Sequence, residues 1–202
     1  MQGIADSFYL CGMQKTNVAI FASGTGSNAV NLIRHFADHS SIDVAFVLSN
    51  KEDADVLTSA RELGITTFYR SNDDVADAEV LMVLCREMKI DGIVLAGYLR
   101  KIPEQFIQNF EGKIINLHPS LLPKFGGKGM YGSHVHKAVI ESGEEESGIT
   151  IHYVNEAFDE GRIIAQFHCS LDEGETVESL AGKIKWLEHS YFPTVIEQTL
   201  MQ

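Results

Sequence analysis

The sequence has few cysteines, and their spacing does not suit cross-linking. Only three occur in 202 residues, Cys11, Cys85 and Cys169, and no two of them form a Cys-x-x-Cys pair. A disulfide-stabilised secreted scaffold or a zinc knuckle needs more cysteines at closer spacing. The pattern therefore argues against both and indicates free thiols in a reducing compartment, so we expect a cytoplasmic protein.

Long apolar runs and an excess of positive charge are also missing. No apolar stretch approaches the roughly 20 residues that a membrane-spanning helix needs, so we expect no membrane partner. Lys and Arg number 16 against 28 Asp and Glu, for a net charge of -12. Because a nucleic-acid-binding surface needs a basic footprint, this balance argues against DNA or RNA as a partner. A small anionic substrate stays possible, since helix N-termini and backbone amides bind phosphate locally.

The chain also lacks internal repeats, low-complexity tracts and linkers. Its 202 residues are 45% hydrophobic, which is enough for one domain with a sizeable core. Residues 1–10 have neither the basic start nor the long apolar segment of a signal peptide. We therefore predict one domain at residues 17–202, preceded by an extension at residues 1–16 that need not be ordered.

The predicted domain begins with a strand, a glycine-rich turn and a helix. Residues 17–22 form a continuous apolar run, as in a strand buried on both faces. Residues 29–36 have helical spacing, and the turn between the two segments contains Gly26, Ser27 and Asn28. Glycines let the backbone approach a ligand, and a helix N-terminus offers unpaired N–H groups. The arrangement therefore predicts a phosphate-binding site.

Two other interpretations of this turn stay open. Residues 24–29 also fit the GxGxxG/A dinucleotide fingerprint, which requires an acidic residue at the end of the second strand. That strand, at residues 44–48, is followed by Ser49, Asn50 and Lys51, which weakens the dinucleotide interpretation. The turn could equally be a tight strand-to-helix connection that binds nothing.

Strands and helices continue to alternate through the first half of the chain. Hydrophobic spacing predicts helices at residues 55–63 and 73–88, and short strands at residues 65–69 and 91–97. Strands that alternate with helices in this way form a mostly parallel sheet with helices on both faces. We therefore predict a Rossmann-like, doubly wound α/β fold.

The second half of the chain predicts a change of strand direction. Strands are expected at residues 148–154 and 162–171, and the short turn between them favours antiparallel pairing. The predicted sheet is therefore mixed, with an antiparallel carboxy-terminal part. Thr176 can cap a last helix that runs towards Leu200, and we predict a break in that helix near Pro193.

An amide and an imidazole follow one another closely at the end of a predicted strand. Asn116 lies on the strand predicted at residues 113–117, and His118 follows directly after it. On an extended backbone, side chains two residues apart point to the same side. Pro119 favours an extended conformation at His118. Open α/β sheets bind ligands at the carboxyl ends of their strands, and an amide donor beside an imidazole suits a developing oxyanion. A polar strand end followed by a proline-stiffened loop is the alternative.

The segment after this strand is rich in glycine and histidine. Four glycines in residues 126–132 predict a mobile loop that borders the site and can close over a substrate. His134 and His136 follow at the start of a predicted helix, at residues 133–142. No cysteine or carboxylate stands at ligand spacing from them, so we predict no metal site.

The segment from Asn116 to Pro123 reads Asn-Leu-His-Pro-Ser-Leu-Leu-Pro. It resembles the signature of the folate-dependent formyltransferases, and the likeness extends from about Asn17 to the C-terminus. The resemblance implies transfer of a formyl group from 10-formyltetrahydrofolate, as co-substrate, to the amine of glycinamide ribonucleotide in purine biosynthesis. It also implies a monomer or homodimer that needs no metal.

The resemblance further implies roles for individual residues. Asn116, a protonated His118 and Asp159 would be catalytic, with the first two stabilising the oxyanion. Gly26, Ser27 and Asn28 would hold the phosphate of the ribonucleotide, and Glu188 its ribose. Asn116 and Asp159 would also contact the folate. The other implied folate-binding residues are Leu99, Arg100, Lys101, Ile102 and Asn155.

One departure from the family and three rival functions stay open. The family often carries a basic residue early in its third helix, where this chain has Asn72, Asp73 and Asp74, so contacts to the folate tail are not predicted. Asp159 could be only a turn former. The rivals are a formyltetrahydrofolate hydrolase, a formyltransferase acting on aminoacyl-tRNA or a sugar, and a non-catalytic nucleotide-binding module.

Overall fold

The computed structural model describes residues 15–202. Within them the strands of the sheet are β1 (Thr16–Phe21), β2 (Ile42–Ser49), β3 (Thr66–Tyr69), β4 (Gly92–Leu95), β5 (Lys113–His118), β6 (Glu146–Tyr153) and β7 (Ile163–Ser170). The helices are α1 (Ser27–Phe36), α2 (Asp55–Glu62), α3 (Ala78–Glu87), α4 (Glu104–Asn109), α5 (Ser133–Glu141) and α6 (Val177–Leu200), with a 3₁₀ turn, η1 (Asp74–Ala76). The predicted extension falls, apart from Lys15 and Thr16, outside the described residues.

The strands form one mixed sheet in the order β3-β2-β1-β4-β5-β6-β7. Neighbouring strands from β3 to β5 pair in parallel, while β6 pairs antiparallel with β5 and β7. The prediction of a doubly wound, mostly parallel sheet with an antiparallel end is confirmed. The chain reverses its direction along the sheet between β1 and β4, and such a switch point is where open α/β sheets bind ligands.

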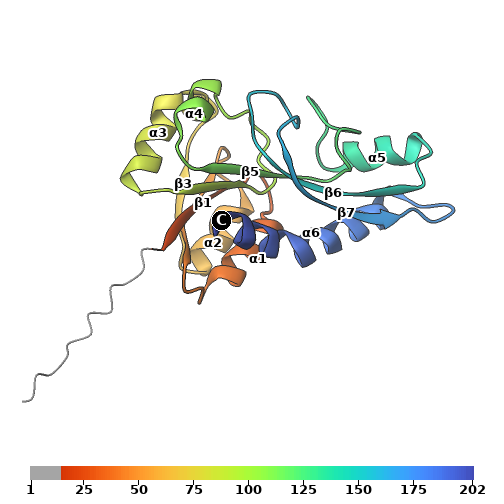
Figure 1. Cartoon of the computed structure of the whole chain (residues 1–202), viewed down its shortest axis with the longest axis horizontal. Coiled ribbons are helices and arrows are strands. Elements are labelled where there is room, and N and C mark those ends of the chain that lie inside the picture. The colour runs from red at the N-terminus through yellow and green to blue at the C-terminus, as the bar shows by residue number, and fades with distance from the viewer. Residues whose placement is uncertain (1–14) are drawn as a thin grey trace, which may run out of the picture.

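The sheet separates two apolar layers, as the alternation of side chains along β1 requires. Val18 and Ile20 face a buried cluster shared with α1, α2, α5 and α6, whereas Ala19 and Phe21 face a second cluster shared with α3 and α4. Full burial of one such large side chain contributes about 1.5–3 kcal/mol. In Figure 1, α3 and α4 lie on one side of the sheet and α1 and α6 on the other.

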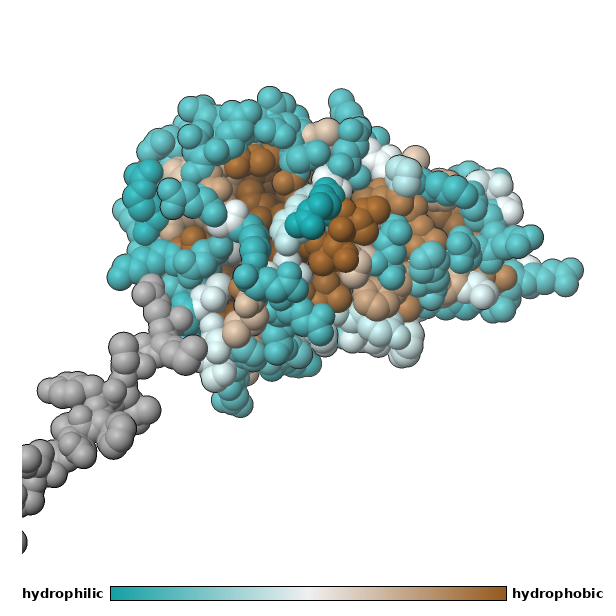
Figure 2. All heavy atoms as spheres, in the orientation of Figure 1, coloured by the Kyte–Doolittle hydropathy of each residue, from teal (hydrophilic) through white to brown (hydrophobic). Residues whose placement is uncertain are grey.

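One face of the molecule is mostly polar. Figure 2 shows hydrophilic side chains over most of one face and hydrophobic side chains gathered towards its middle. None of the helices in residues 15–202 is both long and apolar enough to cross a membrane. In the same residues, Cys85 and Cys169 are free thiols, and no three His, Cys, Asp or Glu side chains are grouped so that they could hold a metal ion. Cys11 lies outside the described part of the chain.

The prediction of one continuous helix at residues 73–88 is wrong. It is divided into η1 and α3 at Asp77, whose backbone is extended and whose carboxylate accepts a hydrogen bond from the Glu79 amide at 2.9 Å. The Asp74 carboxylate accepts a bond from the Ser71 amide at 2.8 Å. Asp77 therefore caps the start of α3, whereas Asp74 bonds back to an amide that precedes η1.

The predicted break near Pro193 is also wrong, because α6 runs without interruption from Val177 to Leu200. Proline removes the amide that would bond the carbonyl four residues earlier, which here belongs to His189. That carbonyl accepts a hydrogen bond from the Asn31 side chain at 2.9 Å instead. The predicted cap at Thr176 is confirmed, since its hydroxyl accepts from the Ser179 amide at 3.1 Å.

Candidate active site

A cavity of about 740 Å³ opens beside the carboxyl ends of β4 and β5. Its volume falls within the usual range for small-molecule sites, about 300–1,000 Å³. Ten of the predicted site residues line it: Asn28, Leu99, Arg100, Lys101, Ile102, Asn116, His118, Asn155, Asp159 and Glu188. The other two, Gly26 and Ser27, lie at the N-terminus of α1, next to Asn28. The structure therefore brings the predicted catalytic and folate-binding residues to one cavity, together with Asn28 and Glu188 of the predicted nucleotide site.

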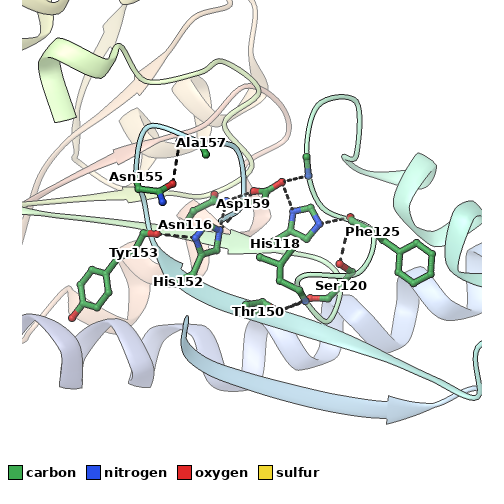
Figure 3. Close-up of polar contacts among 12 residues, drawn as sticks. Asn116, His118, Ser120, Phe125, Thr150, His152, Tyr153, Asn155, Ala157 and Asp159 are labelled. Carbon is green, nitrogen blue, oxygen red and sulfur yellow. Dashed lines mark hydrogen bonds and ion pairs between the residues drawn. The ribbon is translucent and has the colours of Figure 1, made fainter. Parts of the chain in front are cut away.

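The carboxylate of Asp159 links the three predicted catalytic residues (Figure 3). Its Oδ2 atom lies 3.5 Å from His118 Nδ1 and accepts a hydrogen bond from the Gly127 amide at 2.9 Å. Its Oδ1 atom accepts a longer bond, 3.4 Å, from the Asn116 side chain. Asp159 has a φ of 58°, a left-handed conformation that aspartate tolerates in turns. The turn between β6 and β7 thus directs this carboxylate towards the end of β5.

The ring of His118 is fixed by its other nitrogen. Nε2 lies 2.8 Å from the carbonyl oxygen of Phe125, and a carbonyl only accepts hydrogen bonds, so Nε2 carries a proton. In the neutral ring, Nδ1 is then unprotonated and faces Asp159. The side chain is only 4% exposed, which limits competition from water. His118 therefore offers Nδ1 as its reactive atom.

Burial decides the charge of His118 in the free protein. It lowers the pKa of the imidazole, and the opposing effects of the Asp159 charge and the Phe125 carbonyl do not reverse this. The pKa of Asp159 is also lowered. Burial would raise it, but the nearby His152, whose Nε2 lies 3.7 Å from Oδ1, the nearby His118 and the Gly127 amide outweigh that effect. The free site therefore favours a neutral imidazole beside an ionised carboxylate. The protonated His118 expected from the resemblance belongs to the reaction and stays a prediction.

His152 belongs to the same group, and sequence reasoning missed it. Its Nδ1 donates to the carbonyl of Tyr153 at 2.9 Å, which leaves Nε2 as an acceptor for the Asn116 amide at 3.1 Å. This contact directs the NH₂ group of Asn116, rather than its carbonyl, towards the site. His152 lies opposite Asn116 in the antiparallel register of β5 and β6. The sequence could have identified it only if this strand pairing had been known.

Buried polar contacts hold the turn that carries the Phe125 carbonyl. Ser120 donates from its hydroxyl to the carbonyl of Lys124 at 2.8 Å, and the Thr150 hydroxyl donates to the carbonyl of Ser120 at 2.6 Å. Gln166, on β7, donates to the Thr150 hydroxyl at 2.9 Å. Because buried and fully paired networks are rigid, they place the Phe125 carbonyl firmly against His118.

The predicted nucleotide end is formed by α1 and α6. Among the described residues, no side chain caps the N-terminus of α1, so its first amides are available to an anion. Asn28 donates to Glu188 at 2.8 Å and so joins the two helices. Burial raises the pKa of Glu188, while the Asn28 bond and the charge of Lys185 oppose the shift.

Gly26 is required here by packing as well as by backbone conformation. Its φ is 73°, and an added Cβ would lie 2.1 Å from Cγ2 of Val56 on α2. We expect Gly26→Ala to destabilise the fold by roughly 1–3 kcal/mol through overpacking. Thermal unfolding would show this as a loss of about 2–4 °C per kcal/mol.

Gly24 provides the matched control for this change. A Cβ at Gly24 would meet nothing within 4 Å, so Gly24→Ala should leave the melting temperature nearly unchanged. Equal melting temperatures for the two variants would contradict the packing role of Gly26.

The predicted folate end lies along the segment after β4. The Leu99 amide donates to the Ser23 hydroxyl at 2.9 Å, which fixes the start of this segment. Lys101 pairs with Glu104 at 2.8 Å and lies 5.9 Å from the centre of the Phe158 ring. Phe158 and Tyr131 also line the cavity and are 43% and 47% exposed, although the sequence had not identified either as a site residue. Exposed aromatic side chains at a cavity mouth are typical of a binding surface.

The residue at the end of β2 argues against a dinucleotide-binding site. Asn50 occupies the region where a ribose-binding carboxylate would stand, and it is buried. It accepts from the Ser23 hydroxyl at 2.6 Å and donates to Asn72 at 2.9 Å. Its polar groups are therefore used within the protein.

The chain is similar to known proteins over most of its length. A family model described as formyl transferase matches residues 16–196. The chain is 40% identical over 190 residues to a chloroplastic phosphoribosylglycinamide formyltransferase of Arabidopsis thaliana, covering 91% of this chain and 65% of that protein. It is also 40% identical to the chloroplastic enzyme of Vigna unguiculata, covering 92% of this chain and 61% of that protein. The chain thus spans a little under two thirds of the length of these two relatives.

Solved structures of similar proteins match over almost their whole length. The phosphoribosylglycinamide formyltransferase of Anaplasma phagocytophilum superposes with a TM-score of 0.85 at 33% identity, covering 94% of this chain and 88% of that one. Glycinamide ribonucleotide transformylase 1 of Geobacillus kaustophilus gives 0.84 at 33% identity, covering 93% and 100%. The match of the family model over nearly all of the described residues shows that this chain belongs to the formyl transferase family.

Proposed function

We propose that this protein transfers the formyl group of 10-formyltetrahydrofolate to the amine of glycinamide ribonucleotide, a step of purine biosynthesis. The observation that carries the proposal is the single cavity that joins the N-terminus of α1 and Glu188 to Asn116, His118 and Asp159. The N-terminus of α1 and Glu188 suit the binding of an anionic nucleotide. Asn116, His118 and Asp159 suit the catalysis of acyl transfer. The names of the relatives support glycinamide ribonucleotide as the acceptor of a formyl group.

The reaction begins with attack of the amine on the formyl carbon. The new C–N bond gives a tetrahedral intermediate with a negatively charged oxygen, which requires hydrogen-bond donors. Asn116 can supply one by exchanging its long 3.4 Å bond to Asp159 for a bond to this oxygen. His152 holds the donor group in the required direction.

Proton transfer completes the reaction. The attacking amine loses a proton, which moves to His118 Nδ1 directly or through Asp159 or water. The resulting imidazolium is stabilised by the Asp159 carboxylate 3.5 Å away. Its Nδ1–H can donate to the oxyanion and then protonate the folate nitrogen as the C–N bond to folate breaks. No covalent bond to the enzyme is needed.

Absorbance spectroscopy provides the first test of this function. Mixed with 10-formyltetrahydrofolate, the protein should produce tetrahydrofolate only when glycinamide ribonucleotide is present. Release of formate without the ribonucleotide would identify a hydrolase. Binding of the ribonucleotide without turnover would identify a non-catalytic module.

A cytoplasmic location and a monomeric or homodimeric state belong to the proposal as well.

Glu188 is proposed to bind the ribose hydroxyls. Glu188→Gln preserves the shape of the side chain but removes its charge, and a hydrogen bond to a charged group is worth about 1.5–3 kcal/mol. We expect the Kd for the ribonucleotide to rise roughly ten- to a hundredfold, with folate binding unchanged. Glu178→Gln, in the first turn of the same helix, is the control. Equal ribonucleotide affinity in the two variants would remove Glu188 from the site.

A further inference from the structure

His136 lines the cavity although none of the proposed steps uses it. It lies on α5, and its side chain is almost fully buried, with 7% of the residue exposed. Its Nδ1 atom is enclosed and has no hydrogen-bond partner among the described residues. Buried polar atoms without a partner are uncommon in native proteins and call for an explanation.

The enclosed Nδ1 atom determines the tautomer of the ring. Burial lowers the pKa of His136, and no charged group among residues 15–202 opposes this shift, so the imidazole is neutral and carries one proton. Placed on Nδ1, that proton would be a buried donor without an acceptor, which is rarer than an acceptor without a donor. The proton therefore lies on Nε2, which is not among the enclosed unpaired atoms of residues 15–202. His136 thus has an uncharged N–H donor for the cavity.

The position of α5 decides which ligand this donor meets. Val135 and Val139, on either side of His136 in the chain, belong to the apolar cluster shared with α1 and α6. Those two helices carry Asn28 and Glu188. Ile102, at the folate end, belongs to the cluster on the opposite face of the sheet. His136 therefore lies on the nucleotide side of the sheet.

We propose that His136 is a further binding residue for the nucleotide substrate, to which it donates a hydrogen bond from Nε2–H. The acceptor is an oxygen of the phosphate or of the ribosyl glycinamide part. The inference rests on the proposed function for the identity of the nucleotide, but the tautomer does not depend on it. The two ideas can therefore fail separately.

The tautomer is tested first, on the complete protein without ligand. Nitrogen-15 NMR of the histidine rings should show His136 neutral, with its proton on Nε2, and addition of glycinamide ribonucleotide should shift that N–H signal. A proton on Nδ1, or a signal that does not respond to a ribonucleotide that binds, would overturn the proposal.

Variants then test the contact. His136→Leu should raise the Kd and KM for the ribonucleotide about tenfold, the effect of one neutral hydrogen bond, with kcat and the KM for folate within twofold. His136→Asn, which retains an N–H donor, should recover part of the loss. His134→Leu is the control, because His134 is exposed on the same helix and does not line the cavity. A lower melting temperature with unchanged ribonucleotide affinity in both His136 variants would overturn the proposal.

The ribonucleoside without its phosphate locates the acceptor. If His136→Leu weakens the ribonucleotide but not the ribonucleoside, the acceptor is a phosphate oxygen; equal weakening places it on the ribosyl glycinamide part. Weakened folate binding with unchanged ribonucleotide binding would contradict the assignment to the nucleotide side. If the wild-type protein binds both ligands but transfers no formyl group, the proposed function fails while the binding role of His136 stands.

Discussion

Replacing His118 with alanine should lower kcat by about 10²–10⁴-fold, the usual contribution of a positioned acid–base group. The variant loses the Nδ1 atom that faces Asp159 at 3.5 Å. It also loses the donor to the Phe125 carbonyl, which should loosen the turn beside the cavity. Both ligands should still bind, because the main role of His118 is in proton transfer and in the transition state.

Four measured quantities separate a catalytic from a structural role for His118. These are kcat, the two ligand dissociation constants and the melting temperature. His168→Ala removes an exposed histidine paired with Glu146 and should leave all of them unchanged. If His118→Ala keeps kcat within tenfold while its melting temperature falls, His118 is only a structural residue of the turn.

Replacing Asp159 with asparagine should lower kcat by a similar factor, about 10²–10⁴-fold or more. The change keeps the shape of the side chain but removes the negative charge beside His118. A nearby negative charge favours the imidazolium, so the pKa of His118, already lowered by burial, should fall further. Less of the imidazolium that serves the oxyanion can then form.

NMR titration of His118 in both proteins checks the sign of this effect directly. The wild-type pKa should be the higher of the two, and the fraction of imidazolium at any pH near it should be smaller in Asp159→Asn. The control is Glu160→Gln, which removes an exposed charge from the neighbouring residue and should have little effect. An unchanged His118 pKa together with unchanged turnover would make Asp159 only a turn former.

The proposed catalytic pair on β5 was predictable because its geometry is local. Two side chains separated by one residue on a strand share a side whatever surrounds them, and the sequence places Asn116 and His118 in that relation. The contribution of Asp159 was implied by resemblance alone. Its direction depends on a left-handed turn and on the Gly127 amide, 32 residues away along the chain.

The residues that sequence reasoning missed depend on distant contacts. His152 reaches Asn116 only through the antiparallel register of β5 and β6. The continuity of α6 through Pro193 depends on Asn31, which is 158 residues from the carbonyl that it satisfies. Proline lacks the backbone N–H that would bond the carbonyl of His189, and this loss can be predicted from the sequence. The side chain that bonds this carbonyl instead cannot.

Gly26 in the glycine-rich turn meets a packing requirement that the sequence did not reveal. Gly26 was predicted from the need for a backbone to approach a phosphate, and the structure adds the contact with Val56 that leaves no room for a Cβ. A packing requirement between α1 and α2 is invisible in the turn itself. Neither Gly26 nor Ser27 lines the main cavity, so their proposed contact with phosphate depends on the amides at the N-terminus of α1.

The central claim is that this site moves a formyl group between two bound substrates. The most direct measurement follows carbon-13 in 10-formyltetrahydrofolate labelled at the formyl carbon, by NMR, in the presence of glycinamide ribonucleotide. The account predicts that the label moves to the amine nitrogen of the ribonucleotide, with tetrahydrofolate as the other product, and that His118→Ala and Asp159→Asn slow this transfer. Label that appears only as formate, or that stays on the folate while both ligands are bound, would contradict it.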